Sequence, residues 1–292
     1  MADTSTPRKK RPTSASPPAG TGPTKEQAAA FRETVYAWCR AHPRPLPWRE
    51  TVDPYAILVS EVMLQQTQVD RAVGKYAGFL DRFPDFATLA AAPLQELLAA
   101  WQGLGYNRRA VALKKCAEAV TERHGGVLPD SVDDLQALPG IGPYTARAIA
   151  AFAFGMPTVF IETNIRAAFI HHFLGDREGV RDAEILPLVA ATLDRSHPRA
   201  WYNALMDYGA MLKKAHGNPA RRSAHHVRQS PFKGSNRELR GRILKALLAT
   251  PGKTEQEIGA DLGVEPAAVR KNLLRMEKEG LVVNLGDRFT IR

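Results

Sequence analysis

Cysteine is scarce in this chain. Its 292 residues include only Cys39 and Cys116, which are far apart in the sequence. Two distant cysteines cannot build a disulfide scaffold, and their scarcity predicts a reducing compartment. Long apolar runs are lacking too, since none approaches the roughly 18–20 residues that a membrane span requires. The N-terminus has no apolar signal core, so we expect a cytoplasmic protein without a membrane partner.

Acidic residues are outnumbered, and the excess of positive charge is concentrated. The net charge is +10. Residues 1–25 carry five Lys or Arg and one Asp, and residues 213–245 carry ten Lys or Arg and one Glu. A merely soluble basic protein would spread its charge, so these two zones favour a polyanionic partner, above all nucleic acid. We therefore expect association with the nucleoid.

Strand-like alternation is lacking over residues 24–213, where helical periodicity prevails. Residues 1–23 are rich in Pro, Ser, Thr, Gly, Lys and Arg, a composition that predicts a disordered basic arm. Thr24 and Gln27 form a capping box, and Asp53 precedes a proline as the N-cap of a second helix. The region predicts an all-α domain. Its further helices are expected at about 69–82, 93–101, 107–123, 131–137, 142–154, 163–174, 182–194 and 199–213.

A different pattern follows a basic linker at 214–235. Three helical stretches at about 236–249, 254–262 and 265–279 precede two short β runs around a Gly-Asp turn. Three helices followed by a hairpin predict a small winged helix-turn-helix domain over 236–292, with its third helix in the recognition position.

Basic residues on that third helix would then contact phosphates or a DNA groove; they are Arg270, Lys271, Arg275 and Lys278. The alternative is a small domain that binds protein and has a solvated basic face.

The stretch "LPGIGPYTARAIAAFAFG" (138–155) predicts a helix-hairpin-helix. Leu138 closes a short helix, Gly140 and Gly142 permit a tight turn, and a long apolar helix bearing Thr145 begins at once. Backbone N–H groups in such a turn, beside a helix N-terminus, form a site for a phosphate. The motif therefore predicts contact with the DNA backbone without recognition of base sequence.

Glu61 is a candidate acid. Within its helix it lies four residues after Ile57 and three after Leu58, so it projects from the same face as those apolar residues. A partly desolvated carboxyl has a raised pKa and can hold a proton near neutrality, as a general acid requires. The alternative is a buried glutamate paired with an arginine for structural reasons.

A second acidic residue stands out in "VFIETNIRAAF" (159–169), where Glu162, Asn164 and Arg166 follow an apolar run. This glutamate is either a structural liability that its surroundings offset or a charge placed there for chemistry.

Four motifs in order resemble the adenine DNA glycosylases of the MutY type. They are "LPWRE" (46–50), "SEVMLQQTQV" (60–69), "WQGLGYNRRA" (101–110) and "ALPGIGPYTARAI" (137–149), and "NALMDYGAM" (203–211) extends them. That family belongs to the helix-hairpin-helix superfamily, which also contains endonuclease III. The resemblance implies a DNA glycosylase domain over 24–213 with two α-helical lobes, one at about 44–159 and the other joining 24–43 to 160–213.

The resemblance also implies roles for single residues. Glu61 matches the acid that protonates the purine N7 and later handles the attacking water. Tyr144 stands where lyases of the superfamily place a Schiff-base lysine, so the chain is expected to be monofunctional. Glu162 and Asn164 match the catalytic aspartate and asparagine, and a fixed carboxylate beside the sugar would stabilise its developing positive charge.

Three further residues, Gln65, Gln66 and Tyr106, match those that enter the duplex while the target base is flipped out. For Tyr106 the alternative is a core aromatic, although "GLGYNRRA" is glycine-rich and basic for a core segment.

The chain departs from the family in three ways. Most relatives follow "GAM" with four cysteines that bind an iron–sulfur cluster, and this chain has none there, so no cofactor is expected. A zinc site is not expected either, because His216, His225 and His226 lack a thiolate or carboxylate to complete a ligand set. The C-terminal segment resembles a winged helix where relatives carry a Nudix-like domain that senses 8-oxoguanine. Finally, Glu162 replaces the aspartate.

The sequence thus predicts a mainly α protein with a two-lobed helix-hairpin-helix glycosylase fold and a small α+β winged helix. We expect a monomeric base excision repair enzyme that acts on double-stranded DNA and removes adenine opposite 8-oxoguanine or guanine. Two alternatives stay open. One is a glycosylase of the same superfamily for mismatched thymine or uracil or for damaged pyrimidines. The other is a DNA-binding regulator with an inactive glycosylase core.

Overall fold

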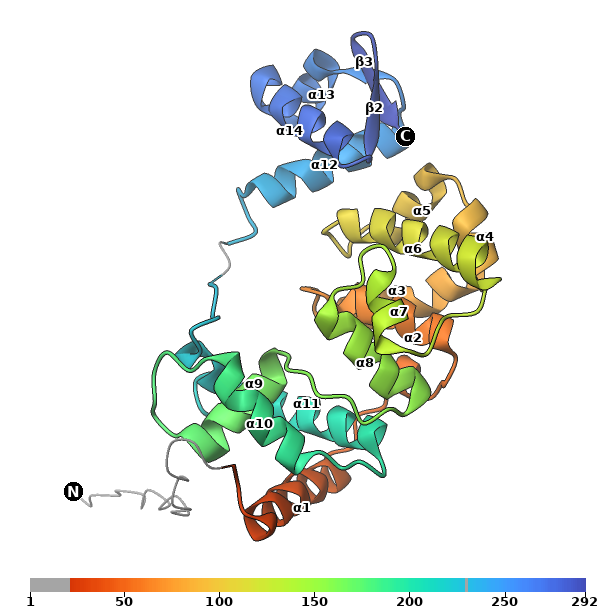
Figure 1. Ribbon diagram of the computed structural model, residues 1–292. Coiled ribbons are helices and arrows are strands. Elements are labelled where there is room, and N and C mark those ends of the chain that lie inside the picture. Colours follow the sequence, from red (N-terminus) through yellow and green to blue (C-terminus); the bar gives the residue numbers. More distant parts are fainter. Residues whose placement is uncertain (1–21, 229–230) are drawn as a thin grey trace, which may run out of the picture. The chain divides into compact units, whose positions relative to one another are not determined.

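The computed structural model describes residues 22–228 and 231–292 (Figure 1). The predicted basic arm therefore lies almost wholly outside the described residues. The chain divides into two compact units, each assembled from segments that are distant in sequence. Of the described residues, unit 1 comprises 22–41, 161–193 and 203–226, and unit 2 comprises 42–160, 194–202, 227–228 and 231–292. Among the described residues, no helix is long and apolar enough to cross a membrane.

Unit 1 is helical and is built around aromatic contacts. Phe31 lies on the buried face of α1 and contacts Phe169 and Phe173, with ring centroids 5.3 and 5.1 Å apart respectively. The predicted capping box at the start of α1 is confirmed, because Thr24 and Gln27 exchange hydrogen bonds. The elements of this unit are α1 (Lys25–Ala41), α9 (Thr163–Phe169), the π-helical turn η2 (Ile170–Leu174), α10 (Asp182–Thr192), most of α11 (Pro198–Ala215) and the short η3 (Pro219–Arg222).

Helices α11 and α9 approach each other backbone to backbone. A Cβ atom added to Gly209 of α11 would lie 2.0 Å from the carbonyl oxygen of Asn164 in α9. Real Cβ atoms do not approach a carbonyl oxygen so closely, so only glycine allows this crossing. The glycine of "MDYGAM" is therefore a packing requirement of unit 1.

Residues 216–226, the first part of the predicted linker, are folded onto unit 1. Arg222 donates a hydrogen bond to the carboxylate of Asp176 at 2.8 Å, and Ala220 is buried. A bridge also joins Val180 to Ser223. The sequence does not reveal this because the segment contributes too few apolar residues to create a periodic pattern.

Residues 42–160 of unit 2 are packed around α2 (Pro54–Leu64). Eight of its 11 residues are buried, and α2 packs against α3, α6 and α8. Asp53 is its N-cap, as predicted, and accepts hydrogen bonds from the N–H groups of Tyr55 and Ala56. The other helices are η1 (Pro47–Arg49), α3 (Val69–Arg82), α4 (Phe86–Ala91), α5 (Leu94–Trp101), α6 (Arg108–His124), α7 (Val132–Ala137) and α8 (Pro143–Phe154). The short α4 is not among the helices expected from the sequence.

The C-terminal part of unit 2 has the predicted three helices and hairpin, together with one unpredicted strand. Strand β3 pairs with β2 and β1 in an antiparallel three-stranded sheet of order β1-β3-β2. The elements are α12 (Asn236–Ala249), β1 (Lys253–Thr254), α13 (Glu255–Leu262), α14 (Pro266–Lys278), β2 (Val282–Leu285) and β3 (Arg288–Ile291). The predicted mainly α fold class is confirmed. We call residues 236–292 the C-terminal module.

Gly209→Ala should destabilise the protein by about 1–3 kcal/mol, because the new methyl group must displace backbone atoms of α9. Gly78→Ala in α3 is the matched control, since nothing lies within 4 Å of the added Cβ. It should raise stability by about 0.5–1 kcal/mol, because alanine has the higher helix propensity. Urea unfolding followed by circular dichroism measures both, and equal midpoints would contradict the packing argument.

Candidate active site

The turn between α7 and α8 has the hairpin geometry that its glycines predict. Gly140 has φ +78°, and a Cβ there would lie 2.7 Å from the Cβ of Ala112. Leu138 ends α7, and its buried side chain anchors the turn. Gly142 differs from expectation, because its φ of −85° is open to any residue and nothing crowds its Cβ position. Only Gly140 is therefore required by backbone shape.

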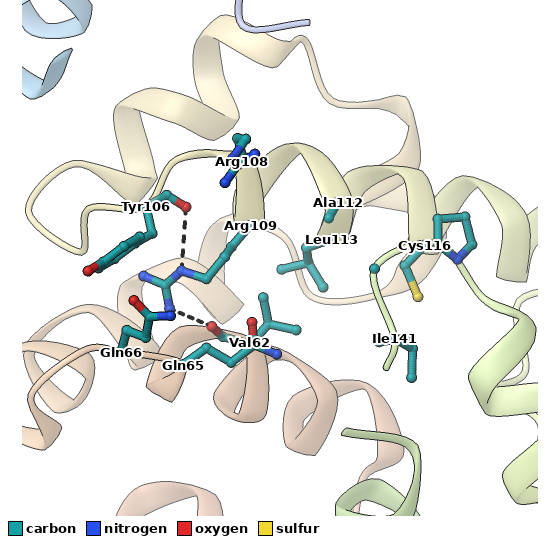
Figure 2. A pocket seen from close by; sticks show the side chains of 12 residues that line it. Val62, Gln65, Gln66, Tyr106, Arg108, Arg109, Ala112, Leu113, Cys116 and Ile141 are labelled. Atoms are coloured by element: carbon teal, nitrogen blue, oxygen red, sulfur yellow. Dashed lines mark hydrogen bonds between the residues drawn. The ribbon is translucent and has the colours of Figure 1, made fainter. Parts of the chain in front are cut away.

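A cavity of about 450 Å³ opens beside this turn (Figure 2). It lies among the end of α2, the loop before α6, the face of α6 and the hairpin. Four residues that the sequence analysis assigned to DNA line this cavity, namely Gln65, Gln66, Tyr106 and Gly140. The other lining residues are Val62, Arg108, Arg109, Ala112, Leu113, Cys116, Pro139 and Ile141.

Two of the cavity residues have strained backbones. Gln66 has φ +56° and Tyr106 has φ +47°. Side chains other than glycine seldom adopt this left-handed region, and such strain persists only where the surroundings enforce it. Both residues stand in loops beside helix ends, so the fold holds these two side chains in fixed places at the cavity.

Arg109 is the surrounding group that fixes these loops, a role that was not expected from the sequence. Its guanidinium donates to the carbonyl oxygens of Val62 and Met63 at 2.7 and 2.8 Å, and to that of Gly105 at 3.0 Å. Burial lowers the pKa of Arg109 to about 10, and the group stays charged at neutral pH. The side chain joins the end of α2 to the loop that carries Tyr106 (Figure 2). A guanidinium next to a glycine-rich loop was the sequence feature that could have identified it.

Thr145 lies on the buried face of α8, and its predicted contact with DNA stays a prediction. Its side chain is buried, and its hydroxyl accepts a hydrogen bond from the Gln65 amide at 3.3 Å. This hydrogen bond orients the side chain of Gln65. The side chain of Leu138 is also buried and packs in the turn, and its predicted place in a DNA-contacting motif stays a prediction.

Tyr144 lies at the start of α8 and is partly exposed. Its ring meets Phe160 edge to face at 5.7 Å, and Phe160 in turn stacks on Tyr202 at 4.0 Å. The position therefore presents a phenol on an aromatic support, with no amine that could form a Schiff base.

Glu61 lies on α2, between the buried residues Ser60 and Val62, and keeps partial solvent exposure. Ile57 and Leu58, which share its face, are fully buried. The carboxyl is thus at the edge of an apolar core rather than inside it. Its role as a proton donor stays a prediction.

Glu162 in unit 1 is the N-cap of α9. Its Oε1 accepts hydrogen bonds from the N–H groups of Asn164 and Ile165 at 2.6 and 2.9 Å. Burial of the carboxyl raises the pKa of Glu162, while these two hydrogen bonds and the charges of Lys213 and Arg166 act in the opposite direction. The helix that Glu162 begins therefore offsets part of the cost of burying the carboxylate.

The neighbours of Glu162 form a polar network. Arg166 makes a two-pronged ion pair with Asp182, at 2.8 and 2.7 Å, and this contact lowers the pKa of Asp182. Lys213 donates to the side-chain oxygen of Asn164 at 3.1 Å. Both predicted catalytic residues of this segment are thus held by named partners within unit 1.

The C-terminal module exposes the predicted basic residues on α14. Arg270, Lys271 and Arg275 are exposed, and Arg270 pairs with Glu255 at 3.3 Å. At the start of α12, Arg237 donates to the hydroxyl of Tyr106 at 2.7 Å. The module therefore contacts a residue of the cavity directly.

Comparison with known proteins places the chain in a family. The model of the HhH-GPD superfamily of base excision DNA repair proteins matches residues 59–262. The adenine DNA glycosylase of Mycolicibacterium smegmatis is 34% identical over 279 residues, covering 88% of this chain and 94% of that one. The human adenine DNA glycosylase is 40% identical over 148 residues, which are 48% of this chain and 27% of the human one.

Comparison with solved structures finds the same fold in other DNA repair enzymes. A thermostable thymine-DNA glycosylase is 26% identical with a TM-score of 0.58, over 64% of this chain and 88% of that chain. Endonuclease III in a non-covalent complex with DNA, at 18% identity and a TM-score of 0.53 over 64% of this chain and 86% of that one, shares the fold. The chain thus belongs to the HhH-GPD superfamily of base excision DNA repair proteins, in its MutY-type adenine DNA glycosylase branch.

Arg109→Lys should lower stability by about 1–3 kcal/mol, because a lysine cannot serve the carbonyl acceptors that the planar guanidinium reaches and leaves some of them unsatisfied. Arg108→Lys is the matched control, since its side chain is 73% exposed and its change should stay within about 0.5 kcal/mol. Thermal and urea unfolding compare the two variants. Equal stability would mean that Arg109 does not hold the loops.

Proposed function

We propose that this chain is a monofunctional DNA glycosylase that hydrolyses the N-glycosidic bond of adenine mispaired with 8-oxoguanine or guanine. The observation that carries the proposal is the similarity to the Mycolicibacterium smegmatis adenine DNA glycosylase, which extends over 94% of that relative. The motifs that resemble the adenine branch fall on α2, on the loop before α6 and on the hairpin, and these elements line the cavity of unit 2.

In the proposed reaction, Glu61 donates a proton to N7 of the extruded adenine, which turns the base into a neutral leaving group. The C1′–N9 bond breaks with its electron pair going to adenine, and the deoxyribose acquires oxocarbenium character. The carboxylate of Glu162 stabilises that charge, with Asn164 beside it. Water then adds to C1′ and gives up a proton to Glu61, which had lost its own proton to the adenine. The products are free adenine and an abasic site in an intact strand.

Monofunctionality is supported by Tyr144. A lyase needs an amine to attack C1′ and form a Schiff base, and a phenol held against Phe160 supplies none. We therefore propose that the strand stays unbroken after base release.

DNA is proposed to bind along the hairpin and the cavity. The backbone N–H groups at the start of α8 face a phosphate. Gln65, Gln66 and Tyr106 enter the duplex while adenine leaves it, and their fixed backbones reduce the entropy lost on binding. The C-terminal module acts as a winged helix that adds phosphate contacts from Arg270, Lys271 and Arg275.

We further propose that the enzyme is a cytoplasmic, nucleoid-associated monomer that works without an iron–sulfur cluster. The absence of a cluster is supported by the cysteines, because the chain has two of them and such a cluster is bound by four. Cys116 is buried, and Cys39 donates its S–H to the carbonyl of Ala204. No described group of three or more His, Cys, Asp or Glu residues is arranged for a metal ion. Iron analysis of the purified protein tests this proposal.

A second candidate is excision of mismatched thymine or uracil. The thymine/uracil-DNA glycosylase of Pyrobaculum aerophilum is 38% identical over 137 residues, which cover 46% of this chain and 60% of that one. Because pocket residues set the base preference in such enzymes, duplexes containing 8-oxoG·A, G·A, G·T and G·U distinguish the two candidates. Release of adenine alone supports the first, and release from none of them supports a regulator.

Glu61→Gln should reduce adenine release by at least about 100-fold, because an amide is not acidic enough to transfer a proton to N7. Binding to the same duplex should persist, since the two side chains have nearly the same shape. Single-turnover excision and gel-shift affinity measure the two properties. Normal turnover by this variant would rule out the proposed mechanism.

Replacing Arg270, Lys271 and Arg275 together by glutamine should weaken duplex binding and make its salt dependence shallower. The slope of log K against log salt concentration should fall by about 0.9 for each phosphate that the variant no longer neutralises. Fluorescence anisotropy over a salt series gives the slope, and an unchanged slope would exclude the module as a DNA anchor.

A further inference from the structure

The close crossing of α11 and α9 places a lysine next to the site in unit 1. Gly209 brings the two backbones together at Asn164. Lys213 lies four residues further along α11, in its last turn, so it is on the same face of the helix as Gly209. The absence of a side chain at position 209 therefore lets the side chain at position 213 reach the first turn of α9.

The contact that results fixes the orientation of Asn164. The Nζ atom of Lys213 lies 3.1 Å from Oδ1 of Asn164. An ammonium group can only donate hydrogen bonds, so the amide oxygen must face Lys213 and the amide nitrogen must face away from it. Meanwhile the backbone N–H of Asn164 donates to Glu162 at 2.6 Å. One lysine thus sets which way the amide donor points beside the carboxylate.

The charges around Glu162 differ in how far they are compensated. Arg166 from α9 is tied to Asp182 of α10 by two short hydrogen bonds, and His225 acts on Asp182 as well. Lys213 from α11 has no carboxylate within ion-pair distance in the described part of the chain. Of the two cations that act on Glu162, Lys213 is thus the one whose charge is not neutralised by an acidic partner.

We infer that Lys213 is a positioning residue for the glycosylase reaction: its ammonium orients the Asn164 amide and keeps a positive charge beside the Glu162 carboxylate. This inference rests on the proposed function, because it assumes that Glu162 and Asn164 serve the sugar. The end of α11, which no cysteine follows in this chain, thereby acquires a role in the glycosylase reaction.

Lys213→Met tests the inference, because methionine retains most of the aliphatic stem and removes the charge and the donor. The rate of single-turnover adenine release should fall by at least about tenfold. This loss should be smaller than the loss caused by removing a donor that contacts the reacting atoms directly. Lys214→Met is the matched control: Lys214 is the exposed neighbour in the same turn, and its variant loses the same charge. It should keep the wild-type rate within about twofold.

The pH profile separates positioning from simple folding support. Removing a nearby positive charge disfavours the ionised carboxylate, so the pKa of Glu162 rises. Activity that requires the carboxylate should therefore be lost at a higher pH in Lys213→Met than in the wild type or in Lys214→Met. Lys213→Arg, which keeps both charge and donor, should restore most of the rate and the original acid limb.

Several outcomes would overturn the inference. Lys213→Met could match Lys214→Met in both rate and pH profile, or it could lose activity with an unmoved acid limb and no recovery in Lys213→Arg. Circular dichroism and duplex affinity confirm that each variant is folded. A wild-type enzyme that releases no adenine would instead contradict the proposed function itself, so the two failures are distinguishable.

Discussion

The cavity of unit 2 depends on one guanidinium. Arg109 donates hydrogen bonds to carbonyl groups at the end of α2 and in the loop before α6. These two segments, which would otherwise be free to separate, are held together by a single side chain. The strained backbones of Gln66 and Tyr106 border these same segments. Strain of this kind persists only when other interactions outweigh it. Hydrogen bonds from a partly buried, charged donor to several acceptors are among the strongest stabilising interactions in a protein. The hairpin, packed through Gly140 against α6, completes the wall.

Much of this architecture could be predicted from the sequence, because it is encoded locally. The capping box at Thr24, the N-cap at Asp53 and the αL glycine of the hairpin each occupy their predicted places. Long helices such as α3 and α8 follow directly from their apolar periodicity. The family resemblance rests on the same segments, since the motifs of α2, the loop before α6 and the hairpin are the ones whose backbone shape is most constrained.

What could not be predicted depends on contacts between distant segments. Arg109 carries no periodic pattern, and its role appears only once the carbonyl groups around it are in place. Thr145 has a side chain suited to a phosphate, yet the rotation of α8 buries it against Gln65. The close approach of Gly209 to Asn164 joins residues 45 positions apart, and nothing near either residue indicates it. Sequence patterns report the local backbone well and the identity of tertiary partners poorly.

The N-cap at Glu162 has a thermodynamic consequence. The N–H groups of Asn164 and Ile165 stabilise the ionised carboxylate, and the ionised carboxylate stabilises the first turn of α9. By linkage these are not two effects, because the free energy by which these two hydrogen bonds favour ionisation equals the free energy by which ionisation strengthens the cap. The strength of the cap is therefore also its contribution to the acidity of Glu162, and this contribution opposes the rise in pKa that burial causes. A substitution that removes these two hydrogen bonds but leaves the carboxyl buried would therefore raise the pKa of Glu162 further.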